Sequence, residues 1–137
     1  MISRPQFSML LQIFIFAILI YGTYIVKKKD FKKHCPLLTL AVALNAISII
    51  FVMGPSFVTM VTALQFSAFL QPLVLISTFH SVIGVIVEVL GMLVILRMKN
   101  VIPVIPGFRN MKETMVLTMR MWLIAMILGI YIYVKIN

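Results

Sequence analysis

The sequence predicts an all-α integral membrane protein whose single domain, residues 1–137, is a bundle of four antiparallel transmembrane helices. Three observations lead to this prediction. Hydrophobic residues make up 63% of the chain and charged residues only 11%, whereas a soluble domain is about half apolar and about 25% charged. Four apolar runs each satisfy the requirement of roughly 20 residues per span. The basic residues lie between these runs, which is typical of membrane topology signals.

The four predicted helices follow one another with short connections, so they form two helical hairpins in tandem. Helices are expected because every backbone polar group inside a bilayer must be satisfied within its own segment. The Gly54-Pro55 pair is expected to bend or end the second helix, because proline lacks the backbone N–H that a helix uses. The predicted spans cover about residues 7–26, 37–58, 72–96 and 112–134.

The orientation of the bundle is predicted from the basic residues of the connections. The loops 27–36 and 97–111 are basic, whereas the connection 54–71 carries no charge. Cytoplasmic loops carry an excess of lysine and arginine, so both basic loops are expected in the cytoplasm and both termini outside. Five lysines of the first loop are expected to set topology and to contact anionic lipid headgroups. They are Lys27, Lys28, Lys29, Lys32 and Lys33.

The outer connection 54–71 is itself apolar, which is unusual for a solvated loop. Such a segment is expected to lie in the outer membrane interface as an amphipathic or re-entrant piece, or to pack against a partner subunit.

Two charged residues lie well inside predicted spans, where charge is costly and usually faces the bundle interior. Glu88 precedes the end of the third span by eight residues, and Arg120 follows the start of the fourth by eight. At about 1.5 Å per residue, both lie roughly 12 Å from the cytoplasmic boundary, so a Glu88–Arg120 ion pair is expected. Asn45 lies at the same depth, which predicts a buried polar cluster of Asn45, Glu88 and Arg120. The Glu88–Arg120 pair is expected to neutralise its own charge and to fix the register of the two helices. The alternative role for these residues is a proton or ion relay.

The chain contains two histidines, too far apart in depth to share one metal. His80 lies in the outer third of the third span and is expected to hydrogen-bond a neighbouring helix. No cofactor is expected. The alternative is a b-type haem with His80 and either a methionine or a second histidine as axial ligands. His34 stands beside Cys35 at the cytoplasmic mouth of the second span. It is expected to contact headgroups, with a cytoplasmic-side metal site as the alternative.

Several functional classes are excluded by the sequence patterns. Nucleic-acid binding is not expected despite the net charge of +9, because the basic residues lie in loops between membrane spans. No nucleophile elbow, phosphate-binding glycine loop, zinc-protease helix or catalytic carboxylate pair is present. We therefore expect no catalysis by this chain alone.

Three segments resemble a four-helix, histidine-containing membrane family often encoded beside haem–copper terminal oxidases. The stretch KKHCPLLTLAVALNAISIIF resembles its second helix, which opens with two basic residues and a histidine. FHSVIGVIVEVLGMLVILRMKN resembles its third helix, with a histidine near the start. FRNMKETMVLTMRMWLIAMILGIYIYVKIN resembles its last helix, with Trp122, Gly129 and Tyr131 in a W-x6-G-x-Y pattern. The resemblance implies four helices and a role in oxidase assembly or haem maturation, or as an accessory chain.

Two histidines of that family are absent from this sequence. Gly54-Pro55-Ser56 replaces one at the outer end of the second helix, and Asn110 replaces one before the fourth. The predicted function is therefore a non-catalytic accessory or assembly subunit of a membrane redox complex, either a respiratory oxidase or a membrane monooxygenase. Its partners would be the lipid bilayer of the cell membrane and other membrane subunits. The alternatives are a single-haem electron-transfer protein using His80 and a small oligomeric transporter using Glu88.

Overall fold

The computed structural model describes residues 1, 3–28, 31–63, 71–104, 107 and 110–136, and these residues form helices and connections without a strand. Four helical segments are long and apolar enough to cross a membrane: Arg4–Lys27, Lys32–Ala63, Pro72–Met98 and Met111–Ile136. The chain is therefore a multi-pass membrane protein with an all-α, four-helix bundle fold, as the sequence predicts.

The first helix, α1, covers Arg4–Lys27 and begins with a capping box. The Ser3 hydroxyl accepts a hydrogen bond from the backbone of Gln6, whose side chain accepts one from the backbone of Ser3. Pro5 stands in the first turn, where a missing N–H costs nothing. These residues start the helix before the apolar run, so α1 begins three residues earlier than predicted.

The second helix, α2, covers Phe31–Ser48 and begins six residues before the predicted start of the span. The difference arises because Lys32 and Lys33 have high helix propensity and continue the helix backwards through Pro36, which lies inside it. Most of the predicted basic loop is therefore helical, and Lys29 lies outside the described residues.

The Gly54-Pro55 pair does not end the second span, contrary to one of the predicted outcomes. A π-helical turn, η1, covers Ile49–Met53, and a further helix, α3, covers Gly54–Ala63. The Gly54 N–H bonds the Ile49 carbonyl, five residues back. Such a turn inserts one residue into a helix and shifts its hydrogen bonds, which lets the chain pass a proline without ending. Half of the predicted outer loop is thus helix, and residues 64–70 lie outside the described part.

Helices α4 and α5 cover Pro72–Met98 and Met111–Ile136, close to the predicted spans. At the end of α4, Asn100 has a φ of 56°, and the N–H groups of Asn100 and Val101 bond the carbonyls of Arg97 and Leu96. This is the left-handed capping arrangement that closes many helices. At the start of α5, the Asn110 side chain accepts a hydrogen bond of 3.0 Å from the Lys112 backbone. Asn110 therefore caps α5.

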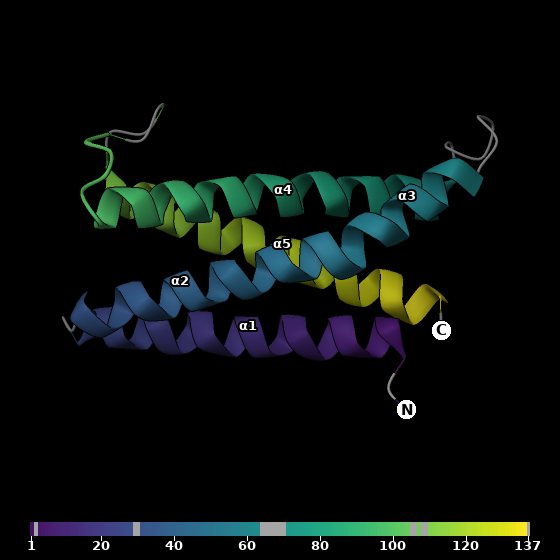
Figure 1. Ribbon diagram of the computed structural model, residues 1–137, viewed down its shortest axis with the longest axis horizontal. Helices are drawn as coiled ribbons and strands as arrows, with labels where there is room; N and C mark the ends of the chain where they lie inside the picture. Colours follow the sequence, from purple (N-terminus) through teal and green to yellow (C-terminus); the bar gives the residue numbers. More distant parts are fainter. Residues whose placement is uncertain (2, 29–30, 64–70, 105–106, 108–109, 137) are drawn as a thin grey trace.

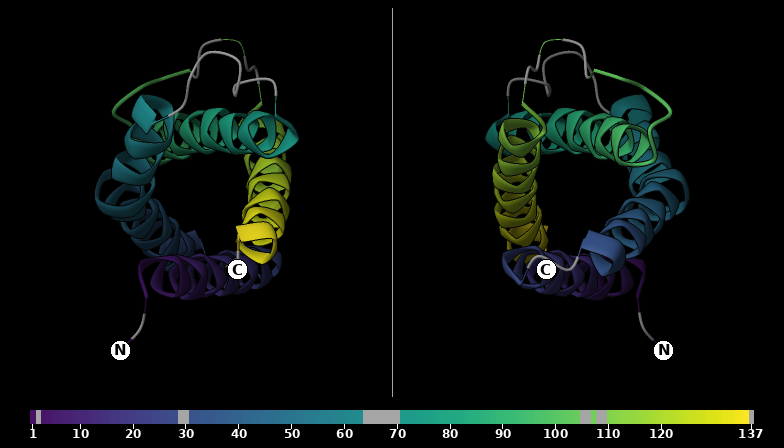
Figure 2. Two further views of the ribbon diagram at one scale, coloured as in Figure 1. Left: turned by 90° about the vertical axis from the view of Figure 1, so that its right-hand side faces the viewer. Right: turned by 90° about the vertical axis from the view of Figure 1, so that its left-hand side faces the viewer.

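The four spans form a ring in which each helix has two neighbours (Figures 1 and 2). Helix α1 packs against α2 and α5, and α4 packs against the same two helices. The end of α1, the start of α2, the end of α4 and the start of α5 lie at one end of the bundle, which we call the basic end. The start of α1, the end of α3, the start of α4 and the end of α5 lie at the opposite end, which we call the terminal end.

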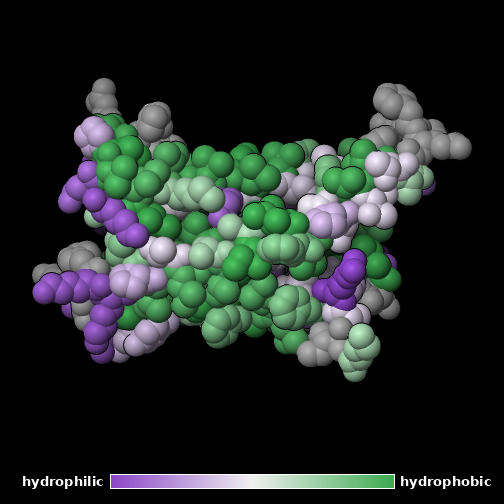
Figure 3. All heavy atoms as spheres, in the orientation of Figure 1, coloured by the Kyte–Doolittle hydropathy of each residue, from purple (hydrophilic) through white to green (hydrophobic). Residues whose placement is uncertain are grey.

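The core lies where the four helices face one another, and its residues are Ile15, Leu19, Ala41, Val42, Val87 and Trp122. The outer surface is apolar along the middle of the bundle, and hydrophilic residues gather at its two ends (Figure 3). Large apolar side chains such as Phe14, Phe51 and Phe79 are more than half exposed. This surface matches a bundle whose middle section is covered by lipid.

Candidate functional site

A chain of side-chain hydrogen bonds crosses the interior of the bundle and links three helices. The Gln12 amide of α1 donates to the Asn45 Oδ1 atom of α2 at 3.2 Å. The Asn45 Nδ2 atom donates in turn to the Glu88 Oε2 atom of α4 at 2.7 Å. Asn45 and Glu88 are 5% and 7% exposed. We call this chain, Gln12–Asn45–Glu88, the interior polar chain.

The contact between Asn45 and Glu88 confirms the prediction that the two residues lie at one depth. The sequence-based prediction did not include Gln12. Apart from Asn45, it included only charged residues and histidines as polar groups of the interior. The signal for Gln12 is present in the sequence, however. An amide within an apolar span usually bonds across to a neighbouring helix, and Gln12 is such an amide in the first span.

Arg120 does not belong to the buried cluster, and the predicted Glu88–Arg120 ion pair is not formed. Its side chain is exposed. The core-facing residues of α5 include Thr118 and Trp122. Because successive residues of a helix are about 100° apart, Arg120 projects from the side opposite to both. The depth of a residue along a helix does not fix its direction around the helix, and this direction separates Arg120 from Glu88.

His80 bonds one helix to the next in the half of the bundle toward the terminal end. Its Nδ1 atom lies 2.9 Å from the Ala125 carbonyl oxygen of α5. A Cβ atom added to Gly129 would lie 3.1 Å from Cε1 and 3.7 Å from Nε2 of the imidazole. The absence of a side chain at Gly129 therefore lets the ring pack on the backbone of α5, as the small residues of membrane interfaces generally do.

The surroundings of His80 do not fit a b-type haem. The bond to Ala125 would leave Nε2 for a metal, but the α5 backbone at Gly129 packs against that edge of the ring. The adjacent cavity has a volume of about 250 Å³. Pockets that enclose ligands of drug size start at about 300 Å³, and a porphyrin is no smaller than such ligands.

His34 also bonds a neighbouring helix, at the basic end of the bundle. Its Nδ1 atom lies 3.1 Å from the Gly22 carbonyl oxygen of α1. Cys35 is a partly exposed free cysteine beside it. Among the residues that the structure describes, no group of three or more histidine, cysteine, aspartate or glutamate side chains could hold a metal ion.

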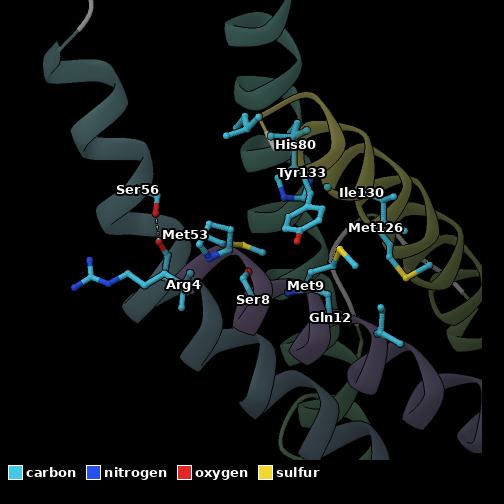
Figure 4. A pocket seen from close by; sticks show the side chains of 16 residues that line it. Arg4, Ser8, Met9, Gln12, Met53, Ser56, His80, Met126, Ile130 and Tyr133 are labelled. Atoms are coloured by element: carbon cyan, nitrogen blue, oxygen red, sulfur yellow. Dashed lines mark hydrogen bonds between the residues drawn. The ribbon is translucent and has the colours of Figure 1, made fainter. Parts of the chain in front are cut away.

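Two cavities open toward opposite ends of the bundle. The first, the terminal cavity, has Gln12 and His80 in its wall and three methionines around it: Met9, Met53 and Met126 (Figure 4). The second, the basic cavity, has a volume of about 400 Å³ and reaches Gly91 and Trp122. Since Gln12 lines one cavity and Gly91 the other, the Glu88 carboxyl group lies between them along the bundle.

Two oxygen atoms near the interior polar chain have no hydrogen-bond partner in the described part of the protein. One is Oε1 of Glu88, and the other is the hydroxyl of Ser48. Ser48 is completely buried and precedes the π-helical turn, whose last residues line the terminal cavity. A third such atom, Nη1 of Arg97, lies near the end of α4. Buried polar atoms without partners are uncommon in folded proteins.

The lysines predicted to contact headgroups lie at the basic end. Lys27 ends α1, while Lys32 and Lys33 lie in the first turn of α2. The Lys28 ammonium group lies 4.5 Å from the centre of the Tyr24 ring. This placement is the one expected for side chains that meet the membrane surface.

Comparisons with known proteins found no match for this chain among protein-family models, curated proteins or solved structures.

Proposed function

We propose that this protein is a non-catalytic accessory or assembly subunit of a membrane redox complex. The observation that carries the proposal is how the polar groups inside the spans are used. They bond one helix to another, in the pairs Gln12–Asn45, Asn45–Glu88, His34–Gly22 and His80–Ala125. Groups engaged in this way stabilise the arrangement of the helices. Both histidines, the residues best suited to ligand a cofactor, are among them.

The sequence resemblance points to a respiratory oxidase as the parent complex, and a membrane monooxygenase is the alternative. In this proposal the bundle resides in the cell membrane with its basic end in the cytoplasm. The lysines of that end contact anionic headgroups. The apolar outer surface packs against lipid and against the larger subunits of the complex.

Purification of a tagged chain from its native membranes in mild detergent tests this proposal. We expect stoichiometric co-purification with larger membrane chains that carry redox centres, and an absorption spectrum accounted for by those chains. An unrelated four-helix membrane protein with the same tag, expressed in the same cells, is the control. A monodisperse chain that purifies alone and shows a haem spectrum lost in His80→Ala would contradict the proposal.

Transport is a second candidate, favoured by the position of Glu88. The carboxyl group lies between two cavities that open toward opposite ends, and Oε1 has no partner among the described residues. Buried carboxyl groups within spans often mark ion or proton pathways. With one such group per chain in the described spans, a pathway would require several copies, so this candidate is a small oligomeric transporter.

Ion flux into vesicles that contain the purified protein distinguishes the two candidates. Glu88→Gln keeps an acceptor for Asn45 but cannot ionise. A transporter would lose flux in this variant while remaining folded. An accessory subunit would show no flux above protein-free vesicles in either form, and Glu88→Gln would co-purify with its partners like the native chain.

A further inference from the structure

Among the described residues, the wall of the basic cavity contains positive charges and no acidic residue to balance them. Three cations line it: Lys27 at the end of α1, Lys112 at the start of α5, and Arg120 two turns further along α5. None of the described residues in its wall is acidic. Within the described part of the chain, none of the three has a carboxyl partner. A cation at membrane depth normally pairs with an anion, so the cavity requires one from outside the chain.

The other polar groups in the cavity wall are already bonded. The Thr23 hydroxyl donates to the Leu19 carbonyl, the Thr118 hydroxyl donates to the Thr114 carbonyl, and His34 bonds the Gly22 carbonyl. The charged side-chain donors of the wall are those of the three cations. The rest of the wall is apolar and consists of Leu19, Val26, Leu38, Gly91, Val94, Met115, Val116, Met119 and Trp122.

The three cations lie along the path by which a lipid would enter the cavity from the basic end. Lys27 and Lys112 lie at the basic end, at the level of lipid headgroups, and Arg120 starts roughly 12 Å deeper along α5. Side chains of a helix lean toward its N-terminus, which for α5 is the basic end. Long arginine side chains also extend toward the membrane surface. The guanidinium group of Arg120 is thus directed toward the level of the two lysines.

The geometry points to a binding site for an anionic phospholipid of the cytoplasmic leaflet in the basic cavity. Its phosphate is held by Lys27, Lys112 and Arg120, and one of its acyl chains lies along the apolar wall beside Trp122. The cavity extends from Trp122 in the bundle interior to Arg120 on the exposed side of α5. It shares Lys27 with the lysines expected to contact headgroups, whereas Lys28 and Lys32 lie outside its wall. A zwitterionic lipid has the same chains but no net charge for the three cations.

Trp122 is a native reporter for this site, because it is the sole tryptophan of the chain and lines the cavity. Bromine atoms on acyl chains quench tryptophan fluorescence on close contact. We would titrate brominated phosphatidylglycerol into the detergent-solubilised protein and follow Trp122 emission. Brominated phosphatidylcholine, with identical chains, tests the requirement for negative charge. We expect saturable quenching by the first lipid and only weak, unsaturated quenching by the second.

Substitutions test whether the cations select the lipid. Since each basic residue near a membrane surface contributes about fivefold to anionic lipid binding, we expect Arg120→Gln and Lys112→Gln each to raise the half-quenching concentration by about fivefold. Lys32→Gln is the matched control, because this lysine lies at the same end but outside the cavity wall. It should leave the titration unchanged. Lys112 is exposed and lies in the first turn of α5, so its replacement should not disturb the fold. The Lys112→Gln variant therefore tests the inference even if Arg120→Gln fails to fold.

Three results would overturn the inference. Equal quenching by the two brominated lipids would show ordinary contact with surrounding lipid. Unchanged titrations in both cavity variants would show that these cations do not hold the phosphate. Reversal of the quenching by millimolar inorganic phosphate would show that the site binds free phosphate rather than a lipid.

Discussion

The Asn45 side chain of α2 donates a hydrogen bond of 2.7 Å to the Glu88 carboxyl group of α4, and both residues are buried. This bond joins the first helical hairpin to the second across the middle of the bundle. Gln12 extends it to α1 through its own bond to Asn45. Inside a bilayer each such bond contributes about 0.6 kcal/mol on average and up to about 2 kcal/mol. The interior polar chain therefore fixes the register between α1, α2 and α4.

Close packing of α2 on α4 beside this bond depends on Gly91. A Cβ atom at Gly91 would lie 2.8 Å from Cγ2 of Val42, well inside the contact distance of about 3.5–4.0 Å. Val42 is buried and β-branched, so its side chain has little freedom to move aside. We expect Gly91→Ala to lower the free energy of unfolding in mixed micelles by about 1–3 kcal/mol.

Gly84→Ala on the same helix is the matched control for that substitution, because nothing lies within 4 Å of its added Cβ atom. Replacing a helical glycine by alanine in open space should be neutral or stabilising by up to about 1 kcal/mol. Equal stabilities for the two variants would show that α2 and α4 are not in close contact at Gly91.

The contact between His80 and Gly129 predicts a dependence of one substitution on the other. Gly129→Ala would place a methyl group 3.1 Å from the imidazole, which is held by its bond to Ala125. We expect this substitution to destabilise the native protein by about 0.5–1 kcal/mol. In a His80→Ala background, where the ring is absent, the same substitution should be harmless. A cost that is the same in both backgrounds would mean that the ring does not lie against Gly129.

The orientation of the bundle can be tested on the single native cysteine. Cys35 is partly exposed and lies near the basic end, which the positive-inside rule places in the cytoplasm. A membrane-impermeant maleimide should label Cys35 in inside-out vesicles and leave it unlabelled in right-side-out vesicles. A Cys35→Ser chain with Lys135→Cys, at the opposite end, should show the reverse pattern. Labelling of Cys35 only from the outside would invert the topology.

The spans could be predicted from the sequence because length and hydropathy are sufficient to define a membrane helix. The depth of Asn45 and Glu88 could be predicted as well, because the helix rise is fixed at about 1.5 Å per residue. The direction in which Arg120 points around the axis of α5 does not follow from its depth. It follows from the spacing of Thr114, Thr118 and Trp122, because these buried residues mark the interior face of the helix.

Other features depend on packing between segments and could not be read from spacing. The passage of the second span through Pro55 requires the π-helical turn before it, which shifts the backbone hydrogen bonds. The basic cavity exists because four helix ends leave space between them. The prediction that His80 bonds a neighbouring helix is confirmed, but its partner, the Ala125 carbonyl, is a backbone group that sequence patterns do not reveal.

Two double-mutant cycles test most directly whether Glu88 pairs with Asn45 rather than with Arg120. Stabilities in mixed micelles would be measured for Asn45→Leu, Arg120→Leu and Glu88→Leu, and for each of the first two combined with the third. We expect a coupling of about 0.5–2 kcal/mol between Asn45 and Glu88. Arg120 and Glu88 should be additive within about 0.5 kcal/mol, as for residues without contact. Strong coupling of Glu88 to Arg120 with none to Asn45 would contradict the interior polar chain.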